Sequence, residues 1–436
     1  MEDINIEKIS NIIKENNSVF LCGNGFSINF DNDFRNIFNR LYESHKILIH
    51  NSKYEINSDN KIFKNKCKDN FENVLQYLRN ISEKKLYKIF DDGIIFAESI
   101  INNREFIEKL KSNDILTNLV FEKNELSLLM ELYNNGKENS SYVNIEYWSI
   151  LIYFYFIIEQ VNFDGYKLPE ENLFVKVVQL GNINKNNTIP YLDKKDRLVE
   201  KVYYNGFNTY YRILFSITIF SNGKCTDLSK LSNINNLNID KIRNFLIEFD
   251  FILTLNYDWI LEMLLPNYIY NILHLHGRYI LDKKEFVNYQ SIGFNSNKEY
   301  VSCSDLLIGD YFYNKIQRGI INILSSKSDS NKNKKIYGYN KILEEVVKNK
   351  KINTFVIFGM SIDNDQHILR TIMASFYFAK INNPQILYCY FSDKEKEVFN
   401  DNFYKIITFD EELSNYSKNI RLKYVKTNEI LNNIFY

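Results

Sequence analysis

Short apolar runs of strand length recur along the chain and are separated by stretches with helical spacing. A strand buried on both faces is apolar throughout, whereas a half-buried strand alternates between polar and apolar residues. Most of these runs are continuous, so they predict an α/β fold in which a parallel sheet is flanked by helices. The continuous runs are residues 18–22, 251–255, 272–275, 354–358 and 386–391.

Two helices and an edge strand are predicted around this sheet. Isoleucines at helical spacing predict an amphipathic helix over residues 4–16, and apolar positions between residues 34 and 41 predict a second helix. Residues 421–425 alternate between polar and apolar side chains, which is typical of an edge strand.

A change in pattern divides the chain into three segments. Between residues 72 and 245 glycine is sparse and helical spacing dominates. We therefore expect residues 1–79 and 246–436 to form the two parts of the sheet domain, and residues 80–245 to form a large, mainly helical insertion. The polar stretch 325–335 is expected to be a loop.

Composition narrows the classes of partner. The 54 basic and 54 acidic residues give a formal net charge of zero, so no basic excess indicates a nucleic-acid partner. Aromatic residues make up 15% of the chain, but Asn, Lys and Ile are also abundant, as in proteins from AT-rich genomes. The aromatic content is therefore weak support for a base-stacking surface.

Cysteine usage and apolar runs indicate a cytoplasmic protein. None of the five cysteines forms a Cys-x-x-Cys pair, which excludes a zinc ribbon and disfavours a disulfide framework. The first residues lack the features of a signal peptide. The longest apolar run, residues 149–158, is about half as long as a membrane span requires, so we expect a buried helix there.

The first candidate site is the turn that follows the strand at 18–22. It carries Gly23, Asn24, Gly25, Phe26 and Ser27. Glycines between a strand and a helix allow backbone N–H groups to approach a pyrophosphate. The dinucleotide fingerprint has a third glycine three residues later, where this chain has Ile28, so the motif alone also fits an ordinary tight turn.

The second candidate site follows the strand at 251–255. Thr254, Asn256 and Asp258 lie at its carboxyl end, where parallel sheets bind their ligands. An amide and a carboxylate at that position can hold ribose hydroxyls and an attacking water. Asp258 also suits the N-cap of the helix that follows, and the two roles are compatible.

Histidines and a late glycine turn complete the set. His274 and His276 are two residues apart, so on a strand their side chains share a face. The turn after the strand at 354–358 carries Gly359, Ser361, Asp365 and His367, which could hold an adenosine or cap a helix at Asp365. A metal site made of the three histidines with Asp363 or Asp365 is an alternative, but no spacing fixes its geometry, and we predict no metal.

The order of these motifs resembles the sirtuin-like superfamily, and its divergent bacterial branch in particular. The resemblance rests on Leu21–Ser27, on Asn70-Phe71-Glu72 and on Gly359–Ile368, and it covers residues 18–79 and 246–391. It implies a Rossmann-like NAD site. Deacylase sirtuins carry a zinc module with two Cys-x-x-Cys pairs, and its lack here makes deacylation improbable.

The resemblance also implies an activity and residue roles. Several bacterial members are antiphage effectors that hydrolyse NAD and arrest the infected cell. By analogy, Asn256 would position water or the nicotinamide ribose, with support from Asp258, and His276 would act as the base or orient the ribose. Gly23, Gly25 and Ser27 would bind the pyrophosphate. Gly359 and Ser361 would bind the adenosine.

These implications favour an NAD glycohydrolase that releases nicotinamide and ADP-ribose and acts in abortive infection. The main alternative is a sensor module that binds NAD or ADP-ribose without cleaving it and reports to a partner protein. A third hypothesis is ADP-ribosyl transfer to a macromolecule. Because a toxic NADase must be restrained, we also expect a homo-oligomer or a regulatory, phage-sensing partner.

Overall fold

The computed structural model describes most of the chain and divides it into two compact units. Unit 1 comprises Met1–Arg35, Phe220–Arg278 and Lys335–Tyr436, and unit 2 comprises Asn36–Ile219 and Tyr279–Lys334. The first part of unit 1 ends at Arg35, so residues 36–79 belong to the helical unit. The described residues are 2–50, 53–57, 61–112, 125–145, 147–182, 198, 201–202, 204–276, 278, 280–281, 291–296, 299–302, 341–406 and 411–436.

Unit 1 contains a seven-stranded sheet in the order β1-β11-β10-β9-β2-β4-β5. Every neighbouring pair is parallel, which confirms the predicted α/β fold with a Rossmann-like parallel sheet. The strands are β1 (Glu2–Asp3), β2 (Ser18–Cys22), β4 (Phe251–Thr254), β5 (Ile272–His274), β9 (Thr354–Phe358), β10 (Gln385–Tyr390) and β11 (Arg421–Lys426).

The strand order places a switch point beside β2. From β2 the chain runs outward through β4 to β5, then returns to the other side of β2 and runs outward through β9, β10 and β11. This is the doubly wound order of dinucleotide-binding folds, in which ligands occupy the crevice at the carboxyl ends of the two strands that flank the reversal. Here those strands are β2 and β9, each followed by a glycine turn.

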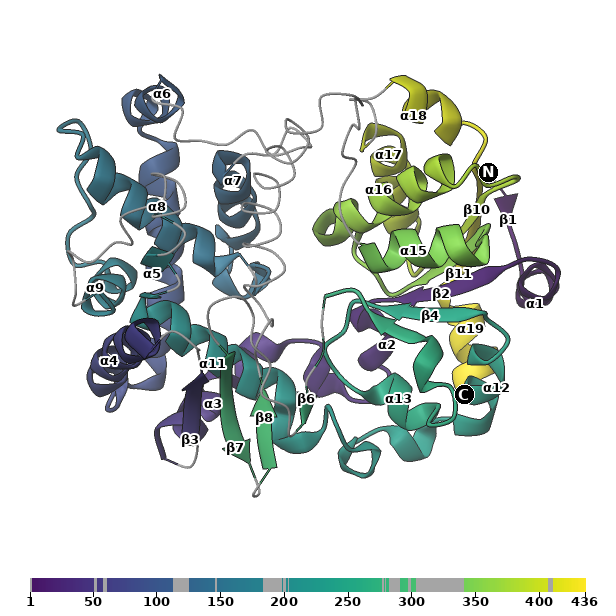
Figure 1. The fold of residues 1–436 in the computed structure, drawn as a ribbon, viewed down its shortest axis with the longest axis horizontal. Helices are drawn as coiled ribbons and strands as arrows, with labels where there is room; N and C mark the ends of the chain where they lie inside the picture. Colours follow the sequence, from purple (N-terminus) through teal and green to yellow (C-terminus); the bar gives the residue numbers. More distant parts are fainter. Residues whose placement is uncertain are drawn as a thin grey trace. The chain divides into compact units, whose positions relative to one another are not determined.

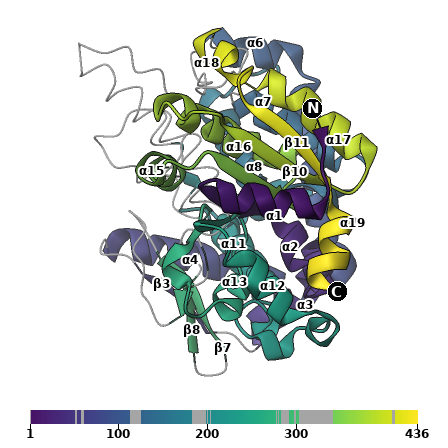
Figure 2. The same ribbon diagram turned by 90° about the vertical axis from the view of Figure 1, so that its right-hand side faces the viewer.

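Helices cover both faces of the sheet (Figures 1 and 2). On one face, Phe355 of β9 packs edge to face against Phe376 of α16. On the other face, Phe20 of β2 contacts Phe245 of α12 and Phe26 of α2. The helices of this unit are α1 (Ile6–Glu15), α2 (Asn24–Ser27), α12 (Ile239–Leu246), α13 (Ile260–Leu264), α15 (Lys341–Lys350), α16 (Ile362–Phe378), α17 (Asp393–Lys405), α18 (Glu411–Ser417) and α19 (Thr427–Ile430).

Unit 2 is mainly helical, as predicted for the insertion. The apolar run at 149–158 lies in α8, and every residue from Trp148 to Ile158 is buried. A four-stranded antiparallel sheet of β3, β7, β8 and β6 was not predicted. The elements are α3 (Leu41–His50), β3 (Lys53–Asn57), α4 (Lys61–Leu78), α5 (Glu83–Ile101), α6 (Arg104–Ser112), α7 (Glu125–Gly136), α8 (Trp148–Val161), α9 (Leu173–Leu180), α11 (Gly206–Phe220), β6 (Ile280–Leu281), β7 (Ser291–Ser296) and β8 (Glu299–Ser302).

Two local predictions were wrong. Residues 34–41 do not form one helix, because the chain makes short 3-10 turns at Asn32–Phe34 and Ile37–Arg40 before α3 begins at Leu41. β11 is not the edge strand, since the two-residue β1 pairs with its outer side. The predicted loop at 325–335 lies outside the described residues.

Candidate functional site

The glycine turns after β2 and β9 pack backbone against backbone. The N–H groups of Gly23 and Gly25 donate to the carbonyl oxygens of Phe358 and Gly359, each at 3.0 Å. A Cβ added to Gly23 would lie 2.6 Å from the Gly359 oxygen, and one added to Gly25 would lie 2.5 Å from the Gly359 Cα. Gly359 itself has a φ of +63°. These glycines are therefore required by the contact between the two turns, and the N–H groups of Gly23 and Gly25 are already bonded.

The other residues of the first turn fix its shape. Asn24 Nδ2 donates to the carbonyl oxygen of Phe34 at 2.8 Å, which holds the segment that follows. Phe26 was expected at the ligand, but it is 1% exposed and packs in the aromatic core against Phe20 and Phe358. Burying an aromatic side chain of this size contributes about 1.5–3 kcal/mol, so Phe26 anchors the turn to the sheet.

A chain of hydrogen bonds links the turn after β2 to the segment after β4. Asn256 Nδ2 donates to Ser27 Oγ at 2.8 Å, and Ser27 Oγ donates to Asp258 Oδ2 at 2.6 Å. Asn256 Nδ2 also donates to the carbonyl oxygen of Gly23 at 3.0 Å. The structure thus brings together two short segments, Gly23–Ser27 and Asn256–Asp258, which lie more than 200 residues apart in the sequence.

These bonds determine how the Asn256 amide is oriented. The Gly23 carbonyl can only accept, so the amide nitrogen of Asn256 must face it. Both amide protons are therefore donated, to Gly23 and to Ser27. The amide oxygen Oδ1 makes no hydrogen bond to the residues that the structure describes, and it is the group of this side chain that remains to accept one.

Asp258 is buried and accepts bonds from both sides. It is 7% exposed, and its Oδ1 accepts from the N–H of Ile260, the first residue of α13, at 3.1 Å. The N-cap residue of α13 is Trp259 and not Asp258 as predicted. Burial raises the pKa of Asp258, and the bonds from Ser27 and Ile260 offset this effect only in part. The carboxyl group joins the segment after β4 to α13 and to the turn after β2.

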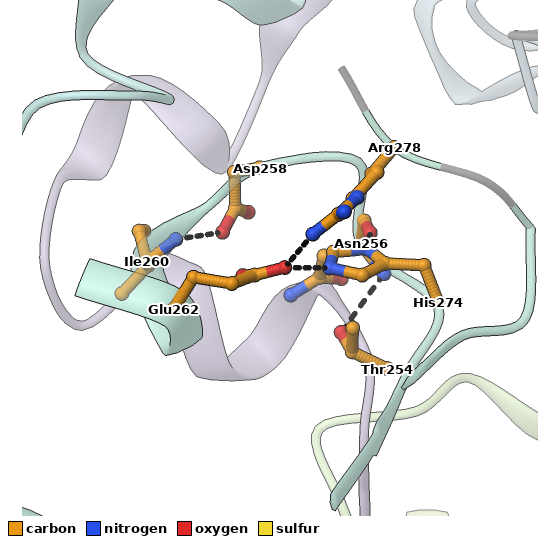
Figure 3. A network of polar contacts seen from close by, with 7 residues as sticks. All are labelled: Thr254, Asn256, Asp258, Ile260, Glu262, His274 and Arg278. Carbon is orange, nitrogen blue, oxygen red and sulfur yellow. Dashed lines mark hydrogen bonds and ion pairs between the residues drawn. The ribbon is translucent and has the colours of Figure 1, made fainter. Parts of the chain in front are cut away.

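A second network lies beside the first (Figure 3). His274, at the end of β5, has Nδ1 2.7 Å from the carbonyl oxygen of Asn256 and Nε2 2.8 Å from Glu262 Oε1. Arg278 Nη1 donates to the same Glu262 oxygen at 2.8 Å, and its guanidinium lies 5.1 Å from the centre of the Trp259 ring. The side chains of His274 and Glu262 are 5% and 4% exposed, whereas that of Arg278 is 38% exposed.

The hydrogen bonds of His274 and Glu262 show how these two side chains are held. A carbonyl oxygen only accepts, so Nδ1 carries a proton. Burial raises the pKa of Glu262, but the hydrogen bonds from His274 and Arg278 outweigh it and hold that pKa below its usual range. Glu262 is therefore a carboxylate at neutral pH, and its Oε1 is hydrogen-bonded to both His274 and Arg278. Through Nδ1, His274 links this carboxylate to the backbone carbonyl of Asn256.

Thr254 and Cys22 are buried at the ends of β4 and β2, next to these networks. The Thr254 hydroxyl accepts from the backbone N–H of Asn256 at 3.1 Å, and Thr254 is 1% exposed. The neighbouring Cys22 thiol is fully buried, and burial raises its pKa to about 12. Thr254 therefore shapes the turn and offers little surface to a ligand.

The turn after β9 differs from its prediction. α16 begins at Ile362 with Ser361 at the N-cap, so Asp365 is not the N-cap of the helix. Asp365 interrupts the helix with a φ of −116° and a ψ of 29°. Ser361 is exposed and makes no side-chain cap bond. The backbone of His367 lies in α16, but its side chain and that of Asp363 lie outside the described residues.

His276 and the metal alternative are constrained by the end of β5. The strand ends at His274, so His276 lies in the following turn and the alternation of a strand does not align the two rings. His276 is 9% exposed. Within the described part of the chain, no three His, Cys, Asp or Glu side chains are grouped so that they could hold a metal ion.

The Asn-Phe-Glu motif lies in unit 2 and not in unit 1. Asn70 Nδ2 donates to the carbonyl oxygen of Tyr204 at 2.8 Å, Phe71 is buried, and Glu72 is exposed on α4. A Cβ on Gly206 would lie 2.0 Å from the Asn70 carbonyl oxygen. The motif therefore fixes the crossing of α4 and α11.

Glu262 and Arg278 were not predicted to be site residues. Glu262 lies four residues after Asp258, in a predicted helix. A charged residue in a helix is ordinarily exposed, so Glu262 did not stand out as a site residue. The available signal was its spacing, because one helical turn places Glu262 near Asp258 and thus near the end of the neighbouring strand. Arg278 follows His276 by two residues and gave no comparable signal.

Among the described residues, no helix is both long and apolar enough to cross a membrane. Comparison of the chain with protein-family models, curated proteins and solved structures gives no match. The interpretation of the site therefore depends on its own geometry.

Proposed function

We propose that this protein is a sirtuin-like NAD glycohydrolase, which cleaves NAD with water to give nicotinamide and ADP-ribose. The observation that carries the proposal is the convergence of Ser27, Asn256 and Asp258 at the carboxyl edge of a doubly wound parallel sheet, next to the switch point between β2 and β9. Nucleotides bind at this edge in such sheets.

The fit of a dinucleotide is supported by the groups left available at this edge. The N–H groups of Gly23 and Gly25 are bonded, so the backbone donors for a pyrophosphate are expected from the first turn of α16. That helix has 17 residues, and the Ser361 side chain does not cap it. Gly359 and Ser361 would hold the adenosine half.

The chemical step requires an oriented water and a stabilised ribose cation. Asn256 Oδ1 is the acceptor left on a side chain whose nitrogen is fixed by two bonds, so it suits the role of holding the attacking water. His276 would take the proton from that water or orient the ribose. The hydrogen bonds of His274 to Glu262 and to the Asn256 carbonyl oxygen keep the Asn256 backbone in place during the reaction.

The test is turnover by the purified full-length chain. We expect nicotinamide and ADP-ribose to form from NAD, and we expect Asn256→Ala and His276→Ala each to lower the rate at least about 100-fold, as for groups acting in the transition state. Asn419→Ala, at an exposed asparagine of the same unit, is the matched control and should keep the wild-type rate. Undiminished turnover in Asn256→Ala would overturn the residue assignment, and no turnover in the wild type would overturn the hydrolase.

A binding module is the second candidate, and one observation favours it. Both amide protons of Asn256 and both ring nitrogens of His274 are used within the protein, as in a scaffold. Calorimetry with NAD and with ADP-ribose separates the candidates. Saturable heat from NAD with no nicotinamide after hours of incubation would favour the sensor.

The biological role that we propose is abortive antiphage defence in the cytoplasm, under the control of a partner protein or of self-association. Its support is the motif resemblance. Measuring cellular NAD during phage infection, with the Asn256→Ala variant as control, tests this role. Survival of the cells with undiminished NAD in the presence of the wild-type chain would contradict it.

A further inference from the structure

Helix α11 of unit 2 carries a buried positive charge with no counter-charge among the residues that the structure describes. Arg212 is 3% exposed, and its Nε and Nη1 atoms have no hydrogen-bond partner. No described carboxylate forms an ion pair with it. Burying a charge without a partner costs more free energy than almost any other feature of a fold. A bound anion beside Arg212 would remove this cost.

The side chains one turn earlier on the same helix are also unsatisfied. Asn208 and Thr209 precede Arg212 by four and three residues, the two spacings that place side chains next to each other on a helix. Both are 0% exposed. Neither the oxygen nor the nitrogen of the Asn208 amide has a partner, and the Thr209 hydroxyl has none. Asn208 and Thr209 thus each lie next to Arg212 on the surface of the helix.

Polar side chains near the two ends of α11 are hydrogen-bonded. Asn205, at the start of α11, donates to the Val178 carbonyl oxygen at 2.9 Å and accepts from the N–H groups of Phe207 and Asn208. Thr218, toward the other end, bonds to Ser44 and to the Leu214 carbonyl oxygen. Asn205 and Thr218 are therefore paired in the usual way.

Cys67 of α4 does not supply the missing charge. It is buried close enough to Arg212 for the guanidinium to act on its ionisation. Burial nevertheless raises the pKa of the Cys67 thiol, and the charges of Arg212 and Lys66 offset only part of that effect. The thiol is neutral at physiological pH.

The chemistry of the patch limits what it can hold. Arg212, Thr209 and the Asn208 nitrogen offer donors to anionic oxygens. The Asn208 oxygen can only accept, so it requires a donor on the ligand. We propose that Asn208, Thr209 and Arg212 bind a small oxyanion that also carries a hydroxyl group, such as monohydrogen phosphate or a hydroxycarboxylate. The site lies in unit 2 and does not depend on the NAD hydrolase proposal.

The test measures anion binding by the full-length chain. Trp148, in unit 2, is the single tryptophan left in a Trp259→Phe background and reports the thermal unfolding of that unit. In chloride buffer, we expect inorganic phosphate or glycolate to raise the unfolding midpoint by at least about 2 °C, because a ligand that binds the folded state stabilises it. Acetate, which lacks the hydroxyl, should raise it less. Whichever of phosphate and glycolate raises the midpoint more identifies the class of ligand.

Arg212→Met removes the charge at similar volume, and Arg79→Met makes the same change at an exposed position as control. We expect Arg212→Met to lose the anion response and to unfold in chloride at or above the wild-type midpoint, while Arg79→Met keeps the response. Because the three side chains are buried, a bound anion can copurify. Ion chromatography after acid denaturation should then find it in the wild type and not in Arg212→Met.

The proposal is overturned if the wild type shows neither an anion response nor a released anion, or if Arg212→Met unfolds well below the wild type in chloride, since Arg212 then has an internal counter-charge. Should Arg212→Met fail to fold, Asn208→Leu decides the question. It keeps the guanidinium and should weaken phosphate or glycolate binding about 10-fold, as for loss of one good hydrogen-bonding group. Unchanged binding in Asn208→Leu would overturn the proposal.

Discussion

The buried hydrogen bond between Glu262 and His274 can be tested by its effect on stability. Replacing Glu262 with Ala removes a 4% exposed carboxylate that accepts from His274 and Arg278, each at 2.8 Å. The His274 bond is charged and buried, so its loss costs about 2 kcal/mol. Arg278 is 38% exposed and can bond to water, so its loss adds little. Lost packing adds about 1 kcal/mol, for a total of about 3 kcal/mol.

Trp259 reports on this site directly, because it lies next to Arg278 and is the only tryptophan left in a Trp148→Phe background. In a unit of this size 1 kcal/mol corresponds to about 2–4 °C, so we expect Glu262→Ala to lower the unfolding midpoint by roughly 6–12 °C at pH 7. Glu262→Gln keeps an oxygen acceptor and the shape, and should lower it by about half as much or less.

The effect should depend on pH in a defined direction. The fold holds the pKa of Glu262 below its unfolded value of 4.5, so the contribution is complete above pH 4.5 and is lost as the pH falls through the folded value. The gap between wild type and Glu262→Ala should therefore be full at pH 7 and much smaller near about pH 3. A midpoint for Glu262→Ala within about 1 °C of wild type at pH 7, or a gap that does not change with pH, would refute the hydrogen bond to a Glu262 carboxylate.

Three further predictions concern the same unit. Gly25→Ala places a Cβ against the Gly359 backbone and should cost about 1–3 kcal/mol, seen as a lower Trp259 midpoint; an unchanged midpoint would show that the turns are not in contact. Cys22, with its pKa raised to about 12 by burial, should resist iodoacetamide at pH 8 until the chain unfolds, and rapid labelling of the native protein, followed by mass spectrometry, would contradict its burial. Lys224→Met leaves the 1% exposed Asp31 without its 2.8 Å cationic partner and should cost about 2–3 kcal/mol at pH 7, with the loss shrinking in acid because the fold holds the pKa of Asp31 below its ordinary value; equal losses at pH 7 and pH 3 would argue against a charged pair.

The sequence alone determined the class of the fold and where most strands of its parallel sheet lie. Buried parallel strands are apolar on both faces, so β2 and β9 were predicted with their observed bounds and the sheet was predicted to be parallel. Asp258 was predicted to bond to the start of the following helix, because that interaction is local, within two residues along the chain, although the N-cap itself is Trp259. In the antiparallel sheet of unit 2, which was missed, β3 pairs with a strand more than 200 positions away.

Only the tertiary structure decided what the site residues do. Gly23 and Gly25 had been explained by close approach of a phosphate, but the contact that requires them is the backbone of Gly359, a residue more than 300 positions away. Phe26 became a core residue, because the face of the sheet that it covers is set by the strand order. Glu262 and Arg278 gained partners through the pairing of β4 with β5, which no local pattern encodes. Local chemistry can be derived from neighbouring residues, whereas burial and long-range partners depend on which strands the chain places side by side.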